Sequence, residues 1–251
     1  MTTLIRYALD FDGVICDSAI ETAVSGFRAA QYFWPEMAAT EIEQAQIDAF
    51  RQVRPWLETG YEAILIMRAL FQGMSVADLC AHYDAHMAAL ISADQLDITE
   101  LKSRFASIRD QWIQQDEQDW LDHNPLFSGM ADKLRKLPKD ALYIVTTKQE
   151  RFVERIIQGS GIDLPMSHIF GMDRQRSKQE TLQQLLSESP DTPMIFIEDR
   201  LPTLLKVQNN PALESIKLQL AGWGYNTRKD IQTARLHKIE IVTLGSFCSI
   251  P

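Results

Sequence analysis

The chain has 251 residues, of which 45% are hydrophobic and 24% are charged, a composition typical of a folded globular protein. No apolar stretch approaches the roughly 20 residues that a membrane span needs, and the first residues lack the pattern of a secretion signal, so we expect a cytoplasmic protein. The formal net charge of −9 argues against a nucleic-acid partner, because such binding depends on Lys and Arg side chains that neutralise phosphates.

The first predicted element is a strand over residues 4–10, which ends in two acidic residues. Asp10 and Asp12 enclose Phe11, and because side chains alternate along an extended chain, the two carboxylates share one face. Gly13 gives the backbone the conformational freedom that a tight turn after the strand requires. Such a pair suits chemistry in which one carboxylate attacks and the other moves protons. An ordinary turn at the end of a strand is the alternative, because Asp and Gly are common turn residues.

From residue 18 to about residue 122 the chain has almost none of the alternation that is typical of strands. Ser18 or the residue before it is placed to cap the first helix, and Glu21 is the reciprocal residue of a capping box. Of the 25 Lys and Arg residues only 7 lie between residues 16 and 126, against 18 of the 34 Asp and Glu residues. This acidic balance supports a separate domain. The predicted helices are residues 18–33, 41–51, 61–71, 76–92, 98–105 and 107–120.

Two histidines, His82 and His86, lie four residues apart in the predicted helix 76–92, which places both imidazoles on one face. Zinc-binding helices use this spacing. The Glu that follows the first His in those helices is absent here, and no third ligand is evident. We therefore interpret the pair as part of an exposed polar face.

After Asn124-Pro125, which ends the helical stretch, strands and helices alternate. Alternation of this kind predicts a parallel sheet with helices on both faces. Because the helical stretch separates the first strand from the second, we expect an α/β fold in which residues 1–15 and 127–251 form a Rossmann-like core and residues 16–126 are inserted as an all-helical cap. The remaining predicted strands are residues 142–146, 168–171, 194–198, 217–221 and 240–244, and the remaining predicted helices are residues 130–136, 150–159, 178–187 and 202–208.

Polar residues follow several of these strands, at the edge where open α/β sheets bind ligands. The strand 142–146 ends in Thr146, and the backbone N–H groups and helix start beyond it suit a phosphate. Lys178 begins a helix and supplies a cation. The strand 194–198 ends in Glu198 and is followed by Asp199, a second acidic pair.

In this order of acid pair, Thr, Lys and acid pair, the whole chain resembles the haloacid dehalogenase (HAD) superfamily of aspartate-nucleophile hydrolases. The resemblance implies that Asp10 is the nucleophile that forms an aspartyl-phosphate and that Asp12 is the acid and base. Thr146 would donate a hydrogen bond to the transferring phosphoryl group, and Lys178 would hold the charges of nucleophile and phosphate together. The implied cofactor is Mg²⁺, with Asp10, Asp199 and the backbone carbonyl of Asp12 as ligands.

The last acid pair departs from the commonest pattern of that superfamily, in which a second Asp follows four residues after the first. Thr203 stands there in this chain, and Glu198 precedes Asp199, so we expect Glu198 to supply the missing carboxylate near the metal. This Glu-Asp-Arg-Leu motif is similar to that of an uncharacterised branch of the superfamily. Residues 223–225, Trp-Gly-Tyr, also resemble the phosphoglycolate phosphatase group, and we interpret their Trp as packing around a tight turn.

The helical cap is expected to select the substrate. Arg51, Arg54 and Arg68 are the cationic candidates in this otherwise acidic stretch, although solvated helix faces are a competing explanation for all three. The residues that we expect to contact the substrate are Gly13, Thr147, Lys148 and Arg54.

The resemblance implies a Mg²⁺-dependent phosphatase of a small phosphorylated metabolite, with no nucleic-acid or membrane partner. A haloacid dehalogenase is an alternative, but such members usually lack the acid that Asp12 supplies. A phosphomutase would keep both acids of the first motif. A non-catalytic or weakly catalytic binding or regulatory protein on the same fold is the fourth hypothesis, and the departure at Thr203 supports it.

Overall fold

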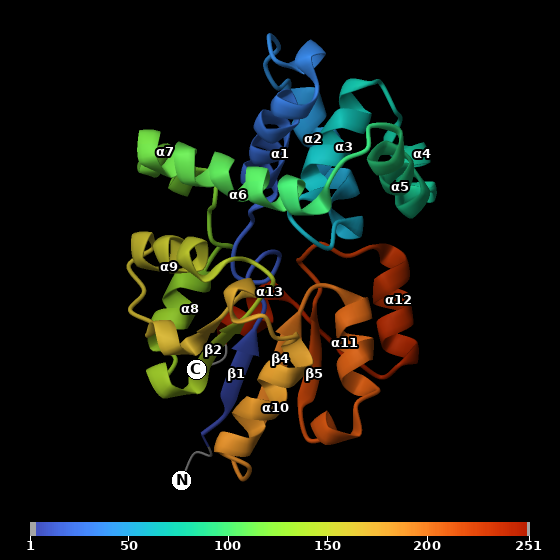
Figure 1. Ribbon diagram of the computed structural model, residues 1–251. Helices are drawn as coiled ribbons and strands as arrows, with labels where there is room; N and C mark the ends of the chain where they lie inside the picture. Colours follow the sequence, from blue (N-terminus) through green and yellow to red (C-terminus); the bar gives the residue numbers. More distant parts are fainter. Residues whose placement is uncertain (1–3, 250–251) are drawn as a thin grey trace. The chain divides into compact units, whose positions relative to one another are not determined.

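The computed structural model describes residues 4–249 (Figure 1). Its contacts divide the chain into two compact units, one comprising residues up to Asp17 together with those from Pro125 onward, and the other comprising Ser18–Asn124. We call them the sheet unit and the helical unit. The domain boundaries expected from the sequence lie within two residues of these. Among residues 4–249, no helix combines the length and the apolar composition that crossing a bilayer requires.

Within the described residues, the sheet unit is built on six parallel strands in the spatial order β3-β2-β1-β4-β5-β6. Figure 1 shows the central part of this order, β2-β1-β4-β5. Leu9 of β1 pairs with Ile144 of β2 on one side and with Ile197 of β4 on the other. The chain adds strands on one side of β1 and then crosses to the other side, so the strand order reverses between β1 and β4. A crevice that binds ligands commonly opens at the carboxyl ends of such a pair. The strands are β1 Arg6–Leu9, β2 Leu142–Val145, β3 Ile169–Phe170, β4 Met194–Glu198, β5 Lys217–Ala221 and β6 Glu240–Val242.

Helices cover both faces of this sheet, as the alternation predicts. On one face, Ala8 and Phe196 belong to a buried apolar cluster with Leu185 of α10. On the other face, Tyr7 meets Phe247 of α13 edge to face, with the ring centroids 6.0 Å apart. The helices of this unit are α8 Met130–Lys136, α9 Glu150–Gly159, α10 Lys178–Glu188, α11 Leu201–Gln208, α12 Arg228–Leu236 and α13 Leu244–Ser249, with 3₁₀ turns η3 Lys139–Ala141, η4 Met166–His168, η5 Met172–Arg174 and η6 Pro211–Leu213.

Two backbone hydrogen bonds join the segments that flank the inserted helical unit. The N–H of Asp17 donates to the carbonyl of Pro125 at 2.9 Å, and the N–H of Phe127 donates to the carbonyl of Ile15 at 3.0 Å. Within the sheet unit these segments therefore run side by side as a short stem, from which the insertion leaves and to which it returns.

The six predicted strands are all present, whereas the end of the chain is predicted less well. The expected strand 240–244 is too long, because β6 ends at Val242 and α13 begins at Leu244. The helix α12 is not predicted from the sequence either, since Ala234 is its one buried residue and Ile231 packs only partly against the same apolar cluster. Its start is nevertheless encoded locally, since Thr227 and Asp230 form a capping box.

The helical unit has an apolar core of its own. Phe27 of α1, Phe50 of α2 and Ile64 of α3 are buried in one cluster. The first and third of these helices approach closely because Gly26 lacks a side chain, and a Cβ atom there would lie 2.8 Å from the Cβ atom of Ala63. The helices are α1 Ala19–Phe33, α2 Gln44–Val53, α3 Glu62–Phe71, α4 Val76–Ala81, α5 Tyr83–Ala93, α6 Ile98–Gln115 and α7 Glu117–Asp122, with 3₁₀ turns η1 Pro35–Met37 and η2 Arg54–Trp56.

Two breaks in this unit differ from the prediction. The expected helix 76–92 is interrupted at His82, which separates α4 from α5. The expected break near residue 106 is absent, and α6 continues to Gln115. The chain breaks instead at Asp116, whose side chain caps α7 by accepting a hydrogen bond from the N–H of Asp119.

The predicted capping role of Glu21 is wrong. Ser18 forms no side-chain capping bond, and Glu21 is fully buried, with its two carboxylate oxygens accepting from Nε and Nη2 of Arg109 at 2.7 and 2.6 Å. Ser25 Oγ and Trp120 Nε1 donate to the same carboxylate at 2.6 and 3.4 Å. Paired bonds from a guanidinium are stronger than one bond to a neutral backbone N–H. Glu21 therefore links α1 to α6 and α7.

Arg109→Ala should lower the free energy of unfolding by about 3–5 kcal/mol, because it removes the guanidinium that donates two hydrogen bonds to the buried Glu21 carboxylate. Glu21→Leu combined with Arg109→Met should recover most of that loss, since no charge then stays buried. Urea denaturation of the full chain followed by circular dichroism measures both values. A loss below about 1 kcal/mol in Arg109→Ala would contradict the proposed role of this pair in the helical unit.

Candidate active site

Three acidic side chains gather where β1 and β4 end. Asp10 follows β1, and its N–H donates to the carbonyl of Ile197 in β4 at 2.9 Å. The adjacent strand thereby brings Glu198 and Asp199 beside it. One carboxylate oxygen of each acid lies within 4.8 Å of the others. The three side chains are almost completely buried, since Asp10, Glu198 and Asp199 are 6%, 0% and 1% exposed.

Lys178 lies between two of these acids. Its Nζ atom is 2.9 Å from Oδ1 of Asp10 and 2.7 Å from Oε2 of Glu198. The lysine is the first residue of α10, where Ser177 and Glu180 form a capping box that fixes the start of the helix. The cation is therefore held by a helix end rather than by a flexible loop.

This environment shifts the pKa values of the buried groups. Burial, followed by the nearby Glu198 carboxylate, raises the pKa of Asp10 to about 7, although Lys178 opposes the shift. Burial and then Asp199 raise the pKa of Glu198, also against the effect of Lys178. Burial alone would lower the pKa of Lys178, but Asp10 and Glu198 outweigh it and raise that pKa. Lys178 thus stays protonated while the acids around it are costly to ionise.

Asp199 is held by the backbone of two loops. Its Oδ2 atom accepts from the N–H of Tyr225 at 2.7 Å. A Cβ atom on Gly13 would lie 2.0 Å from the same Oδ2 atom, and a Cβ atom on Gly224 would lie 2.3 Å from Cβ of Asp199. Gly13 also has a φ of +84°, which disfavours other residues. Both glycines are needed because main chain packs directly against this carboxylate.

The Trp-Gly-Tyr segment after β5 supports the loop that carries the first acid pair. Trp223 Nε1 donates to the carbonyl of Val14 at 3.1 Å, and the Tyr225 hydroxyl donates to Oδ1 of Asp17 at 2.8 Å. The Trp223 ring also stacks on Phe247 at 6.2 Å, consistent with the predicted packing role. The contact of this segment with Asp199 is not predicted from the sequence. In the sequence, the one unusual feature of this segment is a Gly between two aromatic residues after β5.

Asp12 and Lys148 form a second ion pair at this edge. Nζ of Lys148 lies 3.1 Å from Oδ1 of Asp12, with the lysine side chain 1% and the Asp12 side chain 20% exposed. The N–H of Lys148 donates to Oγ1 of the buried Thr146 at 3.2 Å. Lys148, which we expected at the substrate, therefore contacts the acid that was assigned to proton transfer.

The other expected substrate contacts lie in different surroundings. Thr147 is exposed. Arg54 belongs to the helical unit, where it is buried and its Nη1 atom donates to the carbonyl of Leu57 at 3.4 Å. Arg68 of that unit pairs with Glu36 at 2.6 Å.

The donor set at the strand ends fits a hard divalent cation. Such ions bind carboxylate and carbonyl oxygens, and Asp10 and Asp199 present buried carboxylates at close range. The raised pKa of Asp10 shows that ionising this buried carboxyl group is unfavourable. The positive charge of a bound cation, added to that of Lys178, would stabilise the ionised form. Glu198 is less available, since its Oε2 atom contacts Lys178 and its Oε1 atom accepts from the N–H of Arg200 at 3.1 Å.

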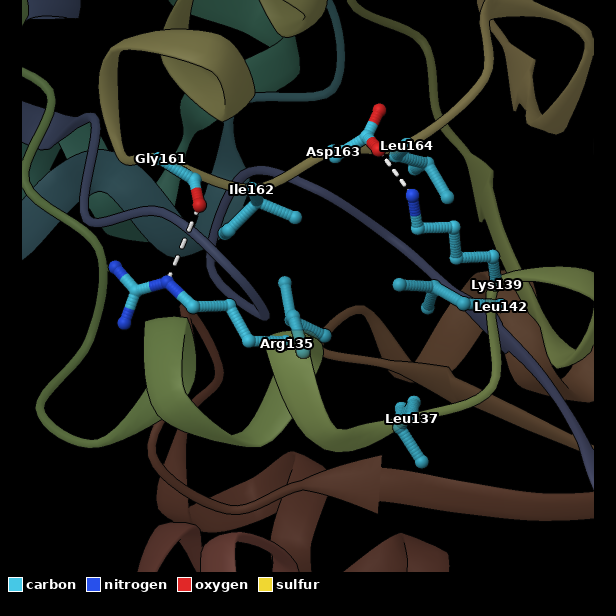
Figure 2. A pocket seen from close by; sticks show the side chains of 9 residues that line it. Arg135, Leu137, Lys139, Leu142, Gly161, Ile162, Asp163 and Leu164 are labelled. Atoms are coloured by element: carbon cyan, nitrogen blue, oxygen red, sulfur yellow. Dashed lines mark hydrogen bonds and ion pairs between the residues drawn. The ribbon is translucent and has the colours of Figure 1, made fainter.

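A pocket elsewhere in the sheet unit is separate from this site. Figure 2 shows Leu142, Ile162 and Leu137 around it, with Arg135 donating to the carbonyl of Gly161 at its rim. Lys139 forms an ion pair with Asp163 on another side (Figure 2). Leu142 begins β2. Because the strands are parallel, the pocket lies near the opposite edge of the sheet from Asp10.

Comparison with known proteins identifies the fold. A predicted HAD-like hydrolase from Bacteroides fragilis matches with 17% identity and a TM-score of 0.56, over 98% of this chain and 99% of that one. A predicted phosphatase from Clostridium acetobutylicum matches with 14% identity and a TM-score of 0.54, over 97% and 96%. A predicted phosphoglycolate phosphatase from Haemophilus somnus matches with 13% identity and a TM-score of 0.56, over 91% and 90%. The chain has the HAD-like fold. No protein-family model and no curated protein matches the sequence.

The HAD-like fold of this chain brings most of the predicted site residues to one edge of the sheet. Asp10, Lys178, Glu198 and Asp199 form one connected cluster. Asp12, Lys148 and Thr146 are connected beside the ends of β1 and β2. Gly13 lies against Asp199, where its role is to admit the carboxylate.

Asp10→Asn should raise the melting temperature at pH 8 in metal-free buffer. The folded-state pKa of Asp10 is raised from 3.8 to about 7, so its ionisation opposes folding increasingly as the pH rises through this interval. The amide removes that cost, and the difference from the unchanged chain should nearly vanish at pH 4. Thermal unfolding at both pH values measures it. Asp191→Asn, at an exposed position, is the control, and an equal or lower melting temperature for Asp10→Asn at pH 8 would refute the prediction.

Gly224→Ala should displace Asp199, because the new Cβ atom would lie 2.3 Å from Cβ of Asp199 and 2.4 Å from the carbonyl oxygen of Gly13. We expect weaker Mg²⁺ binding by at least about tenfold, the size of effect seen when a supporting contact of a metal ligand is lost. Calorimetric titration with Mg²⁺ tests this. Gly245→Ala is the matched control, since nothing lies within 4 Å of its added Cβ atom. Equal Mg²⁺ affinity in the two variants would show that the close approach is unimportant.

Proposed function

We propose that this chain is a phosphatase of the HAD superfamily that hydrolyses a small phosphorylated metabolite with Mg²⁺ through an aspartyl-phosphate. The observation that carries the proposal is the contact of Lys178 with both Asp10 and Glu198 beside Asp199, at the carboxyl edge of β1 and β4. A carboxylate nucleophile repels a phosphate dianion. A buried ammonium group next to that nucleophile reduces the repulsion, and this is what phosphoryl transfer needs.

In the first step a carboxylate oxygen of Asp10 attacks phosphorus, and the bond from phosphorus to the leaving oxygen breaks. Asp12 gives its proton to that oxygen, so the product leaves as a neutral alcohol. In the second step Asp12 takes a proton from water, whose oxygen attacks the phosphorus of the aspartyl-phosphate. The acyl-phosphate bond breaks, which releases inorganic phosphate and restores the Asp10 carboxylate.

Several neighbours support this sequence of steps. Lys178 stabilises the charge of the phosphoryl group and of Asp10, and Glu198 holds Lys178 in place. Thr146 offers a hydroxyl to the transferring group. Lys148 orients the Asp12 carboxyl through its 3.1 Å contact, which keeps the proton-transfer group at the edge of the sheet.

Asp10, Asp199 and the backbone carbonyl of Asp12 would hold Mg²⁺. When bound, the ion supplies positive charge that offsets the developing negative charge on the phosphoryl oxygens. Asp199 is prepared for this role because the N–H of Tyr225 and the two close glycines fix its orientation. Glu198 acts here mainly as the partner of Lys178 rather than as a direct ligand. Glu198, which the sequence led us to expect near the metal, is thereby assigned to positioning Lys178.

Asp12 separates this proposal from the dehalogenase alternative. Release of a halide needs no proton donor, whereas release of an alkoxide from a phosphate ester does. The pairing of Asp12 with the buried Lys148 gives this acid a defined place in the site. We propose that the helical unit selects the substrate, since insertions of this kind can contribute binding residues without changing the sheet.

Phosphate release from a panel of phosphorylated metabolites and from a generic aryl phosphate tests the function. With Mg²⁺ we expect turnover that EDTA abolishes. Asp10→Asn should eliminate it because an amide cannot form the acyl-phosphate, and Asp12→Asn should slow it by about 10²–10⁴-fold. Asp191→Asn, an exposed Asp, is the matched control and should keep full activity. Full turnover in Asp10→Asn would overturn the mechanism, and no turnover of any substrate with Mg²⁺ would favour the non-catalytic alternative.

A further inference from the structure

Three metal-ligating residues recur every four positions along α4 and α5, namely Asp78, His82 and His86. A continuous helix would align them on one face but could not bring all three together. With a rise of about 1.5 Å per residue, positions eight apart are separated by roughly 12 Å along the axis. On a straight helix, Asp78 and His86 would therefore not meet.

The break at His82 changes this geometry. α4 ends at Ala81 and α5 begins at Tyr83, while His82 between them has φ −129° and ψ 33°, outside the helical region. As a result, Oδ1 of Asp78 lies 3.2 Å from Nδ1 of His82, and Oδ2 of Asp78 lies 3.1 Å from Nε2 of His86. One ligand atom of each residue lies within 4.8 Å of the others. The kink converts a row of side chains into a three-sided cluster.

The spacing of the ligand atoms agrees with that of a small metal ion. Zinc binds imidazole nitrogen and carboxylate oxygen at roughly 2.0–2.2 Å, so two ligands of a tetrahedral ion are about 3.3 Å apart. Each carboxylate oxygen of Asp78 has one such neighbour: Nδ1 of His82 lies 3.2 Å from Oδ1, a contact that also satisfies a hydrogen bond, and Nε2 of His86 lies 3.1 Å from Oδ2. The imidazole rings are nearly perpendicular, at 89°, with their centroids 6.0 Å apart. Two nitrogens and one carboxylate are a common donor set for zinc and its neighbours in the first transition row.

A second observation concerns His86. Its Nε2 atom is buried, yet it forms no hydrogen bond of acceptable geometry with any residue in the described part of the chain, despite its proximity to Asp78. A buried ring nitrogen without a hydrogen bond destabilises the folded protein, so such groups are uncommon. An ion between His86 and Asp78 would use its lone pair.

The surrounding contacts hold the cluster in shape while leaving it open to solvent. Ser75 Oγ accepts from the N–H of Asp78 at 3.2 Å, which fixes the start of α4. The Tyr83 hydroxyl donates to Glu62 of α3 at 2.9 Å, which anchors the start of α5. The Asp78 and His82 side chains are 50% and 64% exposed, so an ion can enter directly and water can complete its coordination.

We propose that Asp78, His82 and His86 bind one transition-metal ion of the Zn²⁺ class, with water as a fourth ligand. The ion would clamp α4 to α5 across the kink. This site is independent of the oxygen-rich Mg²⁺ site proposed for the sheet unit, because imidazole ligands favour zinc and its neighbours over magnesium. The competing explanation is a hydrogen-bonded polar trio in which the carboxylate accepts from two imidazole N–H groups.

Titration of the tag-free, chelator-treated full chain with Co²⁺ in excess Mg²⁺ distinguishes the two. A tetrahedral Co²⁺ site absorbs visible light far more strongly than hydrated Co²⁺, and we expect this absorption to saturate at one equivalent and to be lost on addition of Zn²⁺. His82→Gln, His86→Gln and Asp78→Asn should each weaken binding by at least about tenfold, since even indirect contacts of a ligand are worth that much. Far-ultraviolet circular dichroism verifies that each variant is folded.

His237→Gln is the matched control, because it removes an exposed histidine outside the cluster, and Asp199→Asn controls for the sheet site. Both should keep the absorption band. If the band is absent from the unchanged chain, or persists in the folded His86→Gln and Asp78→Asn variants, the cluster is only a polar trio and the proposal is wrong. The readout does not depend on catalysis, so it stands apart from the test of the proposed phosphatase activity.

Discussion

The ammonium group of Lys178 lies between two buried carboxylates of neighbouring strands, and the acidic end of the sheet depends on this contact. Asp10 and Glu198 would repel each other strongly in a poorly solvated site without a cation between them. The partners come from the ends of β1 and β4 and from the start of α10. The strand order, the crossover and the capping of α10 must therefore all form before these charges can coexist.

This dependence also explains why the site combines function with a stability cost. The pKa of Asp10 is raised to about 7 mainly by burial, so the fold keeps a group that would be easier to accommodate as a neutral amide. Packing around the site compensates for this, since Phe11, which follows Asp10, and Ile197, which precedes Glu198, are fully buried. Sites that hold charge for chemistry are commonly less stable than the rest of a protein.

The strands and the polar residues at their ends depend on local sequence, and these could be predicted. Each strand of the described residues has a predicted counterpart, and the strand ends located Asp10, Thr146, Glu198 and Asp199. The resemblance placed Lys178 with them. Contacts between distant segments were not predictable in this way. The pairing of Glu21 with Arg109 joins residues 88 positions apart, and it overrode a plausible local capping pattern.

The same limit applies to the close approaches of main chain. The aromatic residues on either side of Gly224 mark it as unusual, but they do not indicate that Asp199 packs against it, because the contact spans two different loops. At His82 the local pattern predicted a continuous helix, and the break that gathers Asp78 and His86 became visible only with the backbone in place. A periodic sequence pattern implies a straight helix, so a cluster that requires a bend cannot be predicted from it.

The stem formed by Asp17 with Pro125 and by Phe127 with Ile15 has a consequence for how such a chain can change over evolution. Because the two ends of the insertion emerge next to each other and are already joined by hydrogen bonds of the sheet unit, the sheet requires only that the inserted piece begin and end close together. Loop closure depends weakly on the length of what lies between. A different set of helices could thus be exchanged at this point while the residues at the strand ends stay unchanged, and under the proposed role of the helical unit such an exchange would alter substrate choice.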